Sequence, residues 1–551
     1  MMFPRRALLF AFALTPALVH QAAAQPPPAR PGSAVVRGRI MAADTSKPLK
    51  RARVTFMSVD LGGPPRSTTT NVNGQYEMKD LPAGRYNVSA DRSGYLPLRY
   101  GQRRPLESAR PLQVSDGQTI EKIDFTLPRT GAISGRVVDE IGDVVAGATI
   151  FALRTEFWRG RRQLVPAGPA TTTDDVGRYR VTGLAPGSYV IRATTRDRWT
   201  ATRNGSKDSM SFLPTYFSGT TDVATAGRVA VGIGQQIAGI DLQLVPGKTV
   251  TVSGRAVDSR GTPLANVSLS QSTIGPNGGI VGPAAGGGAP VAADGTFTIK
   301  DVVPGEYTLV AAGHDEVARF PLVVTAAGAD NLSLVGSPGW TMTGVVTTDT
   351  GGSPSMPVAR VRVVVTMLTA LPGMIFQGEP RYTQKLDEDW AITIGGISGP
   401  ARVRVLVPDG WALKSIMYKG RDIADSVIEP PSAAETMSGV EVVLTNRVTT
   451  VNGQLVDRQG MPVDGSVVIF STDNAKWYDG TRFIRSTRPD QSGQFSISGL
   501  PAGEYYVIAL EDVQDGAWND PEYLESIRRS ADRITLAEGA TRAIAPKLVI
   551  P

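Results

Sequence analysis

The chain has 551 residues, of which 60 are glycine and 40 are proline, and it carries a formal net charge of +6. It contains no cysteine and only two histidines. This composition excludes disulfides, a lipoprotein attachment cysteine, a histidine-based zinc site, a Ser-His-Asp triad and a Cys-His pair. His20 falls in a predicted leader, and His314 stands beside Asp315 in a polar segment typical of an exposed loop.

Residues 1–24 are predicted to be a secretory signal peptide. Arg5 and Arg6 form its positive region, an apolar stretch follows, and Ala22–Ala24 suits signal cleavage. The apolar stretch is about 13 residues long, short of the roughly 20 that span a bilayer. We therefore expect an exported protein, periplasmic or secreted, with no transmembrane segment after cleavage and no nucleic-acid partner. Residues 25–33 are expected to form a proline-rich, extended leader.

One short phrase recurs along the chain in four clear copies. These are Asn73–Tyr86, Val176–Tyr189, Asp294–Tyr307 and Ser492–Tyr505. Each copy has a turn glycine, a few residues of alternating polarity, a Pro-Ala-Gly or Pro-Gly turn, and a tyrosine. Glycine supplies the positive φ of a tight turn, and alternation is typical of a half-buried strand. The phrase predicts a turn, a strand, a second turn and another strand.

An opening strand with a central glycine precedes each phrase, and an apolar closing strand follows it. The opening glycines are Gly38, Gly135, Gly254, Gly344 and Gly453, spaced by 90 to 119 residues. A repeat of this size can bury its own core, so the pattern predicts domains in tandem. The predicted units are 34–129, 130–247, 248–336 with a glycine-rich loop at 274–290, a degenerate copy at 337–446, and 447–551. In the degenerate copy Trp390 replaces the glycine and aromatic pattern, and Val403 stands where tyrosine is expected.

The opening strand and phrase together resemble the carboxypeptidase regulatory-like domain. This resemblance covers nearly the whole exported chain. It implies an all-β fold of five tandem Greek-key β-sandwiches of the transthyretin or prealbumin type. The family is associated with carbohydrate-binding-like folds, with peptidase accessory domains and with the periplasmic ends of outer-membrane receptors. No catalytic residues are defined for the domain, so the resemblance implies none here.

Aromatic residues outside the repeated pattern are the candidates for ligand contact. They are Tyr95, Tyr100, Trp158, Tyr216, Phe217, Trp477 and Tyr478. Sugar rings can stack on such side chains, whereas the alternative is that the rings pack at sandwich ends or between units. Two basic clusters, Arg99–Arg104 and Arg159–Arg162, are interpreted as solvated loops, with contact to an anionic surface polymer as the alternative.

Acidic turns at 174–175, 387–389 and 490 could ligate calcium, but turn chemistry explains them without a metal. We expect no metal and no cofactor. The leading hypothesis is a non-catalytic extracytoplasmic scaffold or binding protein, a monomeric, semi-flexible rod that presents loops to a glycan or cell-surface polymer. The alternative is a carbohydrate-binding protein with a glycan pocket in one or two units, the second and fifth being the favoured ones. A carboxylate-based hydrolase is the third hypothesis, and it requires two carboxylates across one cleft.

Overall fold

The computed structural model describes residues 32–549 except 60–63, 159–160, 204–205, 271–286, 368–382, 398, 430–434, 458, 491 and 512. Strands β1 to β45 account for most of the described residues, and the one α-helix among them is α1 (Pro521–Ile527). The fold is all-β, as the sequence predicts. The predicted signal peptide and most of the proline-rich leader lie outside the described residues.

The strands form five β-sandwich units, named here units 1 to 5 in chain order. In unit 1 one sheet contains β1 (Ala34–Ala42), β4 (Gln75–Leu81), β8 (Thr119–Ile120) and β9 (Phe125–Leu127). Its second sheet contains β2 (Arg53–Ser58), β3 (Arg66–Thr69), β5 (Gly84–Asp91), β6 (Leu98–Arg99) and β7 (Leu112–Val114). The core of unit 1 lies between these two sheets.

Unit 2 repeats this plan and adds a third small sheet. Its first sheet contains β10 (Gly131–Val138), β14 (Arg178–Leu184), β20 (Gln236–Ile237) and β21 (Leu242–Gln243). Its second contains β11 (Thr149–Trp158), β12 (Arg161–Pro166), β13 (Thr171–Thr172), β15 (Gly187–Thr194), β18 (Thr215–Tyr216) and β19 (Arg228–Val231). The added sheet contains β16 (Arg198–Arg203), β17 (Ser206–Phe212) and β22 (Pro246–Lys248), and η1 (Val223–Thr225) is a short 3-10 turn.

Units 3 and 4 each pair two sheets. In unit 3 the first sheet contains β23 (Val250–Val257), β26 (Thr296–Val302) and β29 (Ala329–Val335). The second sheet contains β24 (Asn266–Ser270), β25 (Gly288–Pro290), β27 (Gly305–Ala312) and β28 (Val317–Val324). In unit 4 the first sheet contains β30 (Trp340–Thr348), β33 (Ala391–Ile397), β35 (Ala412–Tyr418), β36 (Arg421–Asp422) and β37 (Thr436–Thr445). The second sheet contains β31 (Arg362–Met367), β32 (Thr383–Lys385) and β34 (Ala401–Leu406), and η2 (Val358–Arg360) is a short 3-10 turn. Strand β25 corrects part of the predicted glycine-rich loop, because residues 288–290 pair with β24; residues 274–286 lie outside the described residues.

Unit 5 also has two sheets and carries the helix. The first contains β38 (Thr450–Gln454), β41 (Gln494–Ser498) and β44 (Thr541–Ile544). The second contains β39 (Ser466–Ser471), β40 (Ile484–Thr487), β42 (Gly503–Leu510), β43 (Asp532–Leu536) and β45 (Leu548–Val549). Short 3-10 turns are η3 (Asn474–Lys476), η4 (Ala517–Asn519) and η5 (Arg528–Ser530).

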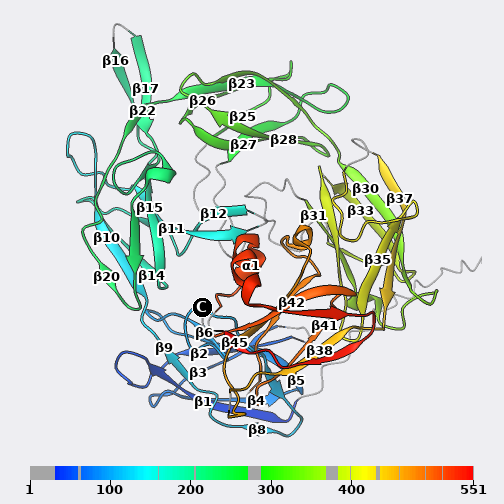
Figure 1. The fold of residues 1–551 in the computed structure, drawn as a ribbon. Helices are drawn as coiled ribbons and strands as arrows, with labels where there is room; N and C mark the ends of the chain where they lie inside the picture. The colour runs from blue at the N-terminus through cyan, green and yellow to red at the C-terminus, as the bar shows by residue number, and fades with distance from the viewer. Residues whose placement is uncertain are drawn as a thin grey trace, which may run out of the picture.

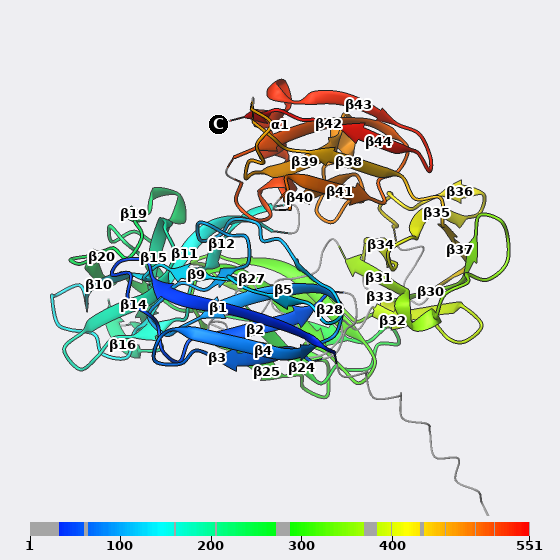
Figure 2. The ribbon, with the colours of Figure 1, turned by 90° about the horizontal axis from the view of Figure 1, so that it is seen from below.

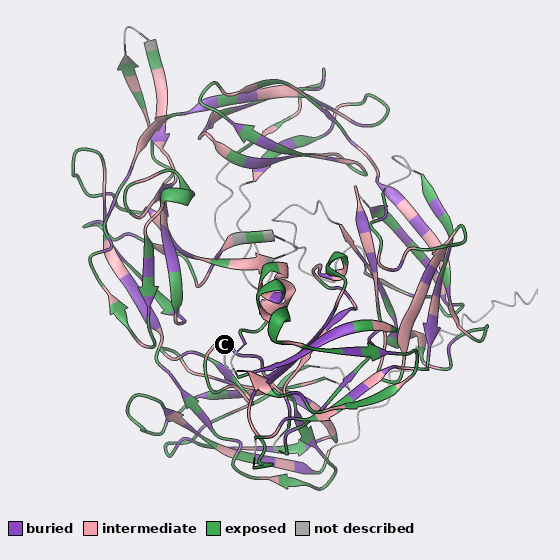
Figure 3. Cartoon of the chain, in the orientation of Figure 1, coloured by how far each residue is buried: buried purple, intermediate pink, exposed green. Residues whose placement is uncertain are grey.

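Burial along the strands follows the predicted alternation. In β1 and β4 the buried residues recur at every second position over much of their length, with exposed and partly exposed residues between them (Figure 3). The apolar side chains of each unit thus face the space between its two sheets. Each of the five main cores draws its buried residues from a single stretch of the chain. Every unit therefore has its own hydrophobic core.

Unit 4 departs from the repeat at its turn. Asp387 accepts backbone hydrogen bonds from Asp389 and Ala391, as Asn71 does from Asn73 and Gln75 in unit 1. This correspondence places Trp390, with φ 62°, at the position of the turn glycine, and Ile392 at the position of the aromatic. A tryptophan in left-handed backbone is strained, and burial of its ring, which is 5% exposed, offsets the strain. The aromatic of this copy is therefore displaced from the pattern.

The five units close on themselves instead of forming the expected rod. In Figure 1 units 1 to 4 follow one another in a ring, with α1 and the hairpin of β11 and β12 drawn toward its middle, and the turned view in Figure 2 places unit 5 on one side of units 1 to 4. Unit 5 contacts unit 1 through Ser108 and Ser466, whose hydroxyl oxygens are 3.0 Å apart. Unit 1 also contacts unit 4, where Arg85 and Asp409 form an ion pair of 2.5 Å. The prediction of a semi-flexible rod is therefore wrong, because paired side chains hold unit 1 against units 4 and 5.

None of the helices within the described ranges combines the length and the apolar character needed to cross a bilayer.

Candidate ligand-binding pockets at the unit junctions

Both basic clusters of the sequence bind acidic residues of unit 5. Arg99 and Arg103 of unit 1 pair with Asp515 and Asp464 at 2.6 and 2.8 Å. Arg162 lies on the hairpin of β11 and β12, and its guanidinium pairs with Asp520 at 2.8 Å and with Glu522. The sequence favours solvated loops for these arginines, with contact to an anionic polymer as the alternative. The side chains of these three arginines are 46–75% exposed, which agrees with solvated loops, and their charges are also paired within the protein.

A more deeply buried arginine lies at the centre of the contact between units 1 and 5. The Arg488 side chain is only 4% exposed and bridges Asp464 of its own unit, at 2.5 Å, and Glu107 of unit 1, at 3.3 Å. It also donates to the Ser108 carbonyl at 2.9 Å. Two carboxylates and a carbonyl thus share one buried guanidinium, which fixes the relative position of the two units.

The aromatic candidates of unit 1 pack against its core. Tyr95 and Tyr100 are partly buried and contact the core cluster. The Arg129 guanidinium lies 4.9 Å from the Tyr95 ring centre, and the Arg110 guanidinium lies 5.1 Å from that of Tyr100. Each ring is therefore covered on one face by an arginine of the same unit.

The candidates of unit 2 also contribute to packing. Tyr216 packs with the small cluster around Phe151, and Phe217 packs against the main core. Trp158 ends β11, where it pairs with Arg161, and its side chain lies outside the described residues. Neither Tyr216 nor Phe217 lines a pocket described below.

The two candidates of unit 5 differ from each other. Trp477 is 6% exposed, donates its Nε1 proton to the Ser471 carbonyl at 2.7 Å, and packs edge-on against Phe470. Because the ring of Trp477 is buried, it is not available to contact a ligand, which corrects the prediction from sequence. Tyr478 lines the cavity between units 4 and 5, and the Arg402 guanidinium lies 3.8 Å from its ring centre.

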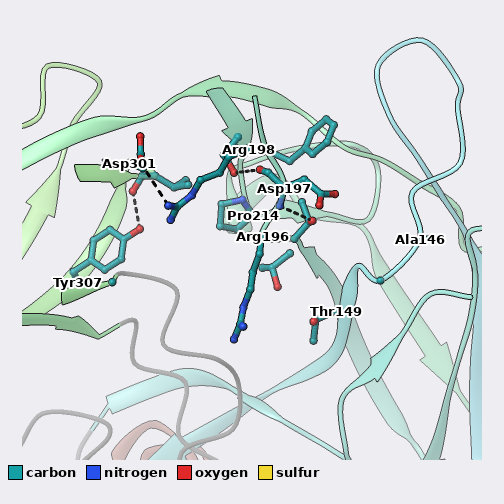
Figure 4. Close-up of a pocket in the computed structure, with 15 residues that line it drawn as sticks. Ala146, Thr149, Arg196, Asp197, Arg198, Pro214, Asp301 and Tyr307 are labelled. Atoms are coloured by element: carbon teal, nitrogen blue, oxygen red, sulfur yellow. Dashed lines mark hydrogen bonds and ion pairs between the residues drawn. The ribbon is translucent and has the colours of Figure 1, made fainter. Parts of the chain in front are cut away.

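The larger junction pocket, between units 2 and 3, has a volume of about 790 Å³. The residues that line it include Thr149, Thr194, Thr195 and Ser211, which carry hydroxyl groups, and the charged Arg196, Asp197, Arg198 and Asp301. Figure 4 shows Arg198 linked to Asp301, an ion pair of 3.6 Å, and Arg196 extending into the space between the units. Asp301 also accepts a hydrogen bond of 2.7 Å from Ser209, which holds it in place.

The second junction pocket, between units 4 and 5, has a volume of about 480 Å³. Arg402 and Arg404 reach it from β34, and Arg482 and Arg485 reach it from the segment around β40. Both β34 and β40 are edge strands of their sheets. Trp411 completes the aromatic part of the lining beside Tyr478.

The acidic turns have a structural role. Asp174 accepts backbone hydrogen bonds from Val176 and Arg178, at 3.1 and 2.7 Å, and Asp490 does the same for Ser492 and Gln494, at 2.9 Å each. These are Asx turns that start the recurring phrase. Across the described part of the chain no group of three or more acidic, histidine or cysteine side chains is placed to hold a metal ion.

Comparison with known proteins identifies the first two units. Residues 35–128 and 132–213 match the family model of the carboxypeptidase regulatory-like domain. Units 1 and 2 contain carboxypeptidase regulatory-like domains. This confirms the resemblance carried by the opening strand and the phrase. In both carboxypeptidase regulatory-like domains the match includes the opening glycine, Gly38 or Gly135, and the phrase tyrosine, Tyr86 or Tyr189.

Solved structures similar to this chain include two pilins and repeat units of a collagen-binding protein, all of low sequence identity. The minor pilin of Streptococcus agalactiae has 15% identity and a TM-score of 0.22, with 40% of this chain and 99% of the pilin covered. A streptococcal ancillary pilin has 16% identity and a TM-score of 0.20, with 55% and 99% covered. Two B repeat units of the collagen-binding protein of Staphylococcus aureus have 13% identity and a TM-score of 0.13, with 75% and 99% covered. No curated protein matches the chain.

Proposed function

We propose that the protein is a non-catalytic extracytoplasmic scaffold that presents loops and junction pockets from one closed body. The observation that carries this proposal is the closure of five separately cored sandwiches through the buried Arg488. Charged contacts of units 1, 2 and 4 with unit 5 hold the surfaces at fixed distances from one another. The predicted signal peptide supports a location outside the cytoplasm. We further propose that the protein is a monomer and that its domains have the bounds expected from the sequence.

The carboxylates of the junction pockets support a binding role over catalysis. A glycosidase needs one carboxyl group as proton donor and a second as nucleophile or base. Asp301 is engaged by Arg198 and Ser209, and Asp425 is held by two hydrogen bonds from Arg482, at 2.9 and 2.7 Å. His314 is 97% exposed and faces Asp315 at 3.7 Å, outside either pocket.

A second candidate function, glycan binding, is favoured by the pocket between units 2 and 3. Its hydroxyl-rich lining and volume of about 790 Å³ suit a polyhydroxylated ligand of a few sugar rings. Arg196 and Asp197 offer donors and acceptors beside the threonine hydroxyls. Several such contacts on one rigid body would add up to useful avidity for a repeating polymer.

Small-angle X-ray scattering of the mature protein tests the scaffold. We expect a monomeric mass and the radius of gyration of the closed arrangement. The larger radius of a string of separated sandwiches would contradict the proposal.

A glycan array tests the second candidate. We expect a signal from the wild type that is lost in Arg196→Ala and kept in Arg260→Ala, whose side chain is 82% exposed and outside both pockets. A blank array would reject glycan binding and leave the scaffold to be judged by its scattering. A signal that Arg196→Ala does not change would place the glycan elsewhere.

A further inference from the structure

The cavity between units 4 and 5 has an excess of positive charge. Four arginines line it, against the carboxylates of Asp409 and Asp425. Asp425 accepts two hydrogen bonds from Arg482, which also donates to the Leu413 and Lys414 carbonyls at 2.8 and 3.1 Å. Asp409 pairs with Arg85 of unit 1. Both lining acids are therefore already neutralised.

Two of the four arginines have no carboxylate partner among the described residues. Arg404 donates to the Asp479 carbonyl and lies 3.7 Å from its carboxylate. Within the described ranges, Arg485 donates only to the carbonyls of Thr481 and Ile484, at 3.3 and 2.9 Å. Arg402 stacks on Tyr478, and its buried Nε has no hydrogen-bond partner within the described part of the chain. Arg402 and Arg485 are thus uncompensated cations at one cavity.

The guanidinium of Arg485 is largely removed from water, and the Nε atom of Arg402 is buried. Desolvation, together with the neighbouring charge of Arg482, lowers the pKa of Arg485 from its ordinary value. An unpaired cation removed from water is unfavourable unless an anion or further hydrogen bonds compensate it. Planar guanidinium groups match a carboxylate in bidentate geometry, so a carboxylate entering the cavity would provide that compensation.

The other residues that line the cavity indicate the chemical character of the ligand beyond its charged group. Trp411 provides an aromatic surface, and Thr481, Ser498 and Asn519 provide hydroxyl and amide groups. A cavity that offers an aromatic surface, many polar groups and net positive charge suits a compact polyhydroxylated acid. An acidic peptide would use the cations but would leave the hydroxyl and amide groups without a comparable role.

We infer that the junction of units 4 and 5 is a binding site for a sugar that carries a carboxylate, a uronic acid unit of an acidic polysaccharide. Arg402 and Arg485 would bind the carboxylate, and Trp411 would lie against the ring. The inference deepens the proposed function. It rests on that function in one respect, that the protein meets polymers outside the cytoplasm. The site is separate from the hydroxyl-rich pocket between units 2 and 3.

Isothermal titration of the full mature protein with tri-galacturonate tests this site. Trigalactose is the neutral match, and a short glutamate-rich peptide is the anionic match. We expect tri-galacturonate to bind and the other two not to bind. Arg402→Gln and Arg485→Gln should each weaken binding at least tenfold, which is about 1.4 kcal/mol. Arg402→Lys should weaken it less than Arg402→Gln, because the positive charge is kept. Arg196→Gln, in the other pocket, is the control and should not change it.

The outcomes separate this inference from the proposed function. Equal binding of trigalactose, or unchanged binding in both glutamine variants, overturns the inference. Binding of the peptide alone also overturns it, because the site would then recognise acidic polypeptide. A thermal melt of each variant excludes unfolding as the cause of lost binding, and Arg402→Lys provides a second measurement if Arg485→Gln does not fold. If tri-galacturonate does not bind while a neutral glycan binds through Arg196, the inference fails and the proposed function stands.

Discussion

The recurring glycines and tyrosines have specific steric and polar reasons. A Cβ built on Gly38, Gly135 or Gly344 would lie 1.9 to 2.0 Å from the carbonyl oxygen of the closing strand. In units 1, 2, 3 and 5 this glycine also pairs directly with the first aromatic of the phrase. The glycine is required because the closing strand and the aromatic ring occupy the space of a side chain.

The phrase tyrosine closes its own turn. Its hydroxyl donates to the carbonyl of the residue four positions earlier in every clear copy. The four pairs are Tyr86 to Pro82 at 2.8 Å, Tyr189 to Ala185 at 2.5 Å, Tyr307 to Val303 at 2.6 Å and Tyr505 to Pro501 at 2.7 Å. Burial raises the pKa of Tyr189 and Tyr505, so both keep this proton at neutral pH. Turn and core are therefore fixed by one side chain.

The opening glycine gives a direct test at the residue scale. We expect Gly135→Ala to destabilise unit 2 by about 1–3 kcal/mol, because the new methyl group clashes with the Ile240 backbone. Urea denaturation followed by fluorescence measures the change. Gly187→Ala is the matched control, since its Cβ would have no neighbour closer than 3.6 Å. Equal effects of the two substitutions would contradict the steric explanation.

At the scale of elements, helix α1 and the hairpin of β11 and β12 share one aspartate. Asp520 caps α1 by accepting from the Glu522 amide at 3.0 Å through Oδ1. Its Oδ2 accepts two hydrogen bonds from Arg162, at 2.9 and 2.8 Å. A seven-residue helix is too short to be stable alone, so this residue both starts α1 and ties it to unit 2.

Two substitutions of Asp520 separate these roles. Asp520→Asn keeps a capping oxygen and weakens the ion pair, and we expect only a small change in hydrogen exchange of residues 521–527. Asp520→Ala loses both contacts and should speed that exchange, at a cost of about 1 kcal/mol for the cap. Equal exchange in the two variants would show that the cap contributes nothing.

The loop after β30 predicts a dependence of stability on pH. Asp349 accepts a hydrogen bond of 2.9 Å from Arg447, which holds its pKa below the ordinary 3.8, and Thr445 also donates to it at 2.9 Å. A lowered folded-state pKa gives stability that is present above pH of about 4 and is lost as pH falls through the folded-state pKa.

Asp349→Asn tests this dependence. We expect the variant to be less stable than the wild type at pH 7, by about 2 kcal/mol for lost hydrogen bonds to a charged group. The difference should shrink as the pH falls from about 4 through the lowered folded-state pKa of Asp349. Denaturant unfolding across this range measures it, with Asp315→Asn, 82% exposed, as control. A difference that stays constant with pH would contradict the role of the charge.

At the scale of the whole molecule, Arg488 is the most deeply buried arginine in the ion pairs between units 1 and 5. We expect Arg488→Met to leave Glu107 and Asp464 without their shared cation, a loss of about 3–5 kcal/mol for a broken buried pair. Scattering should then show a larger radius of gyration, while far-ultraviolet circular dichroism stays that of folded sandwiches. Arg260→Met is the control. An unchanged radius would mean that the remaining contacts close the molecule without Arg488.

The sequence predicts the fold well because its signals are local. The opening glycine, the alternating strand and the turn before the tyrosine lie within one unit and report on that unit alone. Closure depends on residues such as Glu107 and Arg488, which are far apart in sequence and have no recurring pattern. The candidate site was missed for a similar reason: Arg402 and Arg485 are ordinary outward residues of edge strands until unit 5 packs against unit 4. The aromatic residues chosen from sequence mostly pack, because rings outside a repeat are still needed at sandwich ends.

The contact between the first and last units also constrains how such a protein can evolve. An open array of domains gains or loses a copy by duplication without disturbing the others, because each copy meets only its neighbours. Here a copy gained or lost between units 1 and 5 would move Ser466 and Arg488 away from Glu107 and Ser108. The number of units between these two contact surfaces is therefore fixed by geometry, and relatives that keep these four residues should also keep three sandwiches between them.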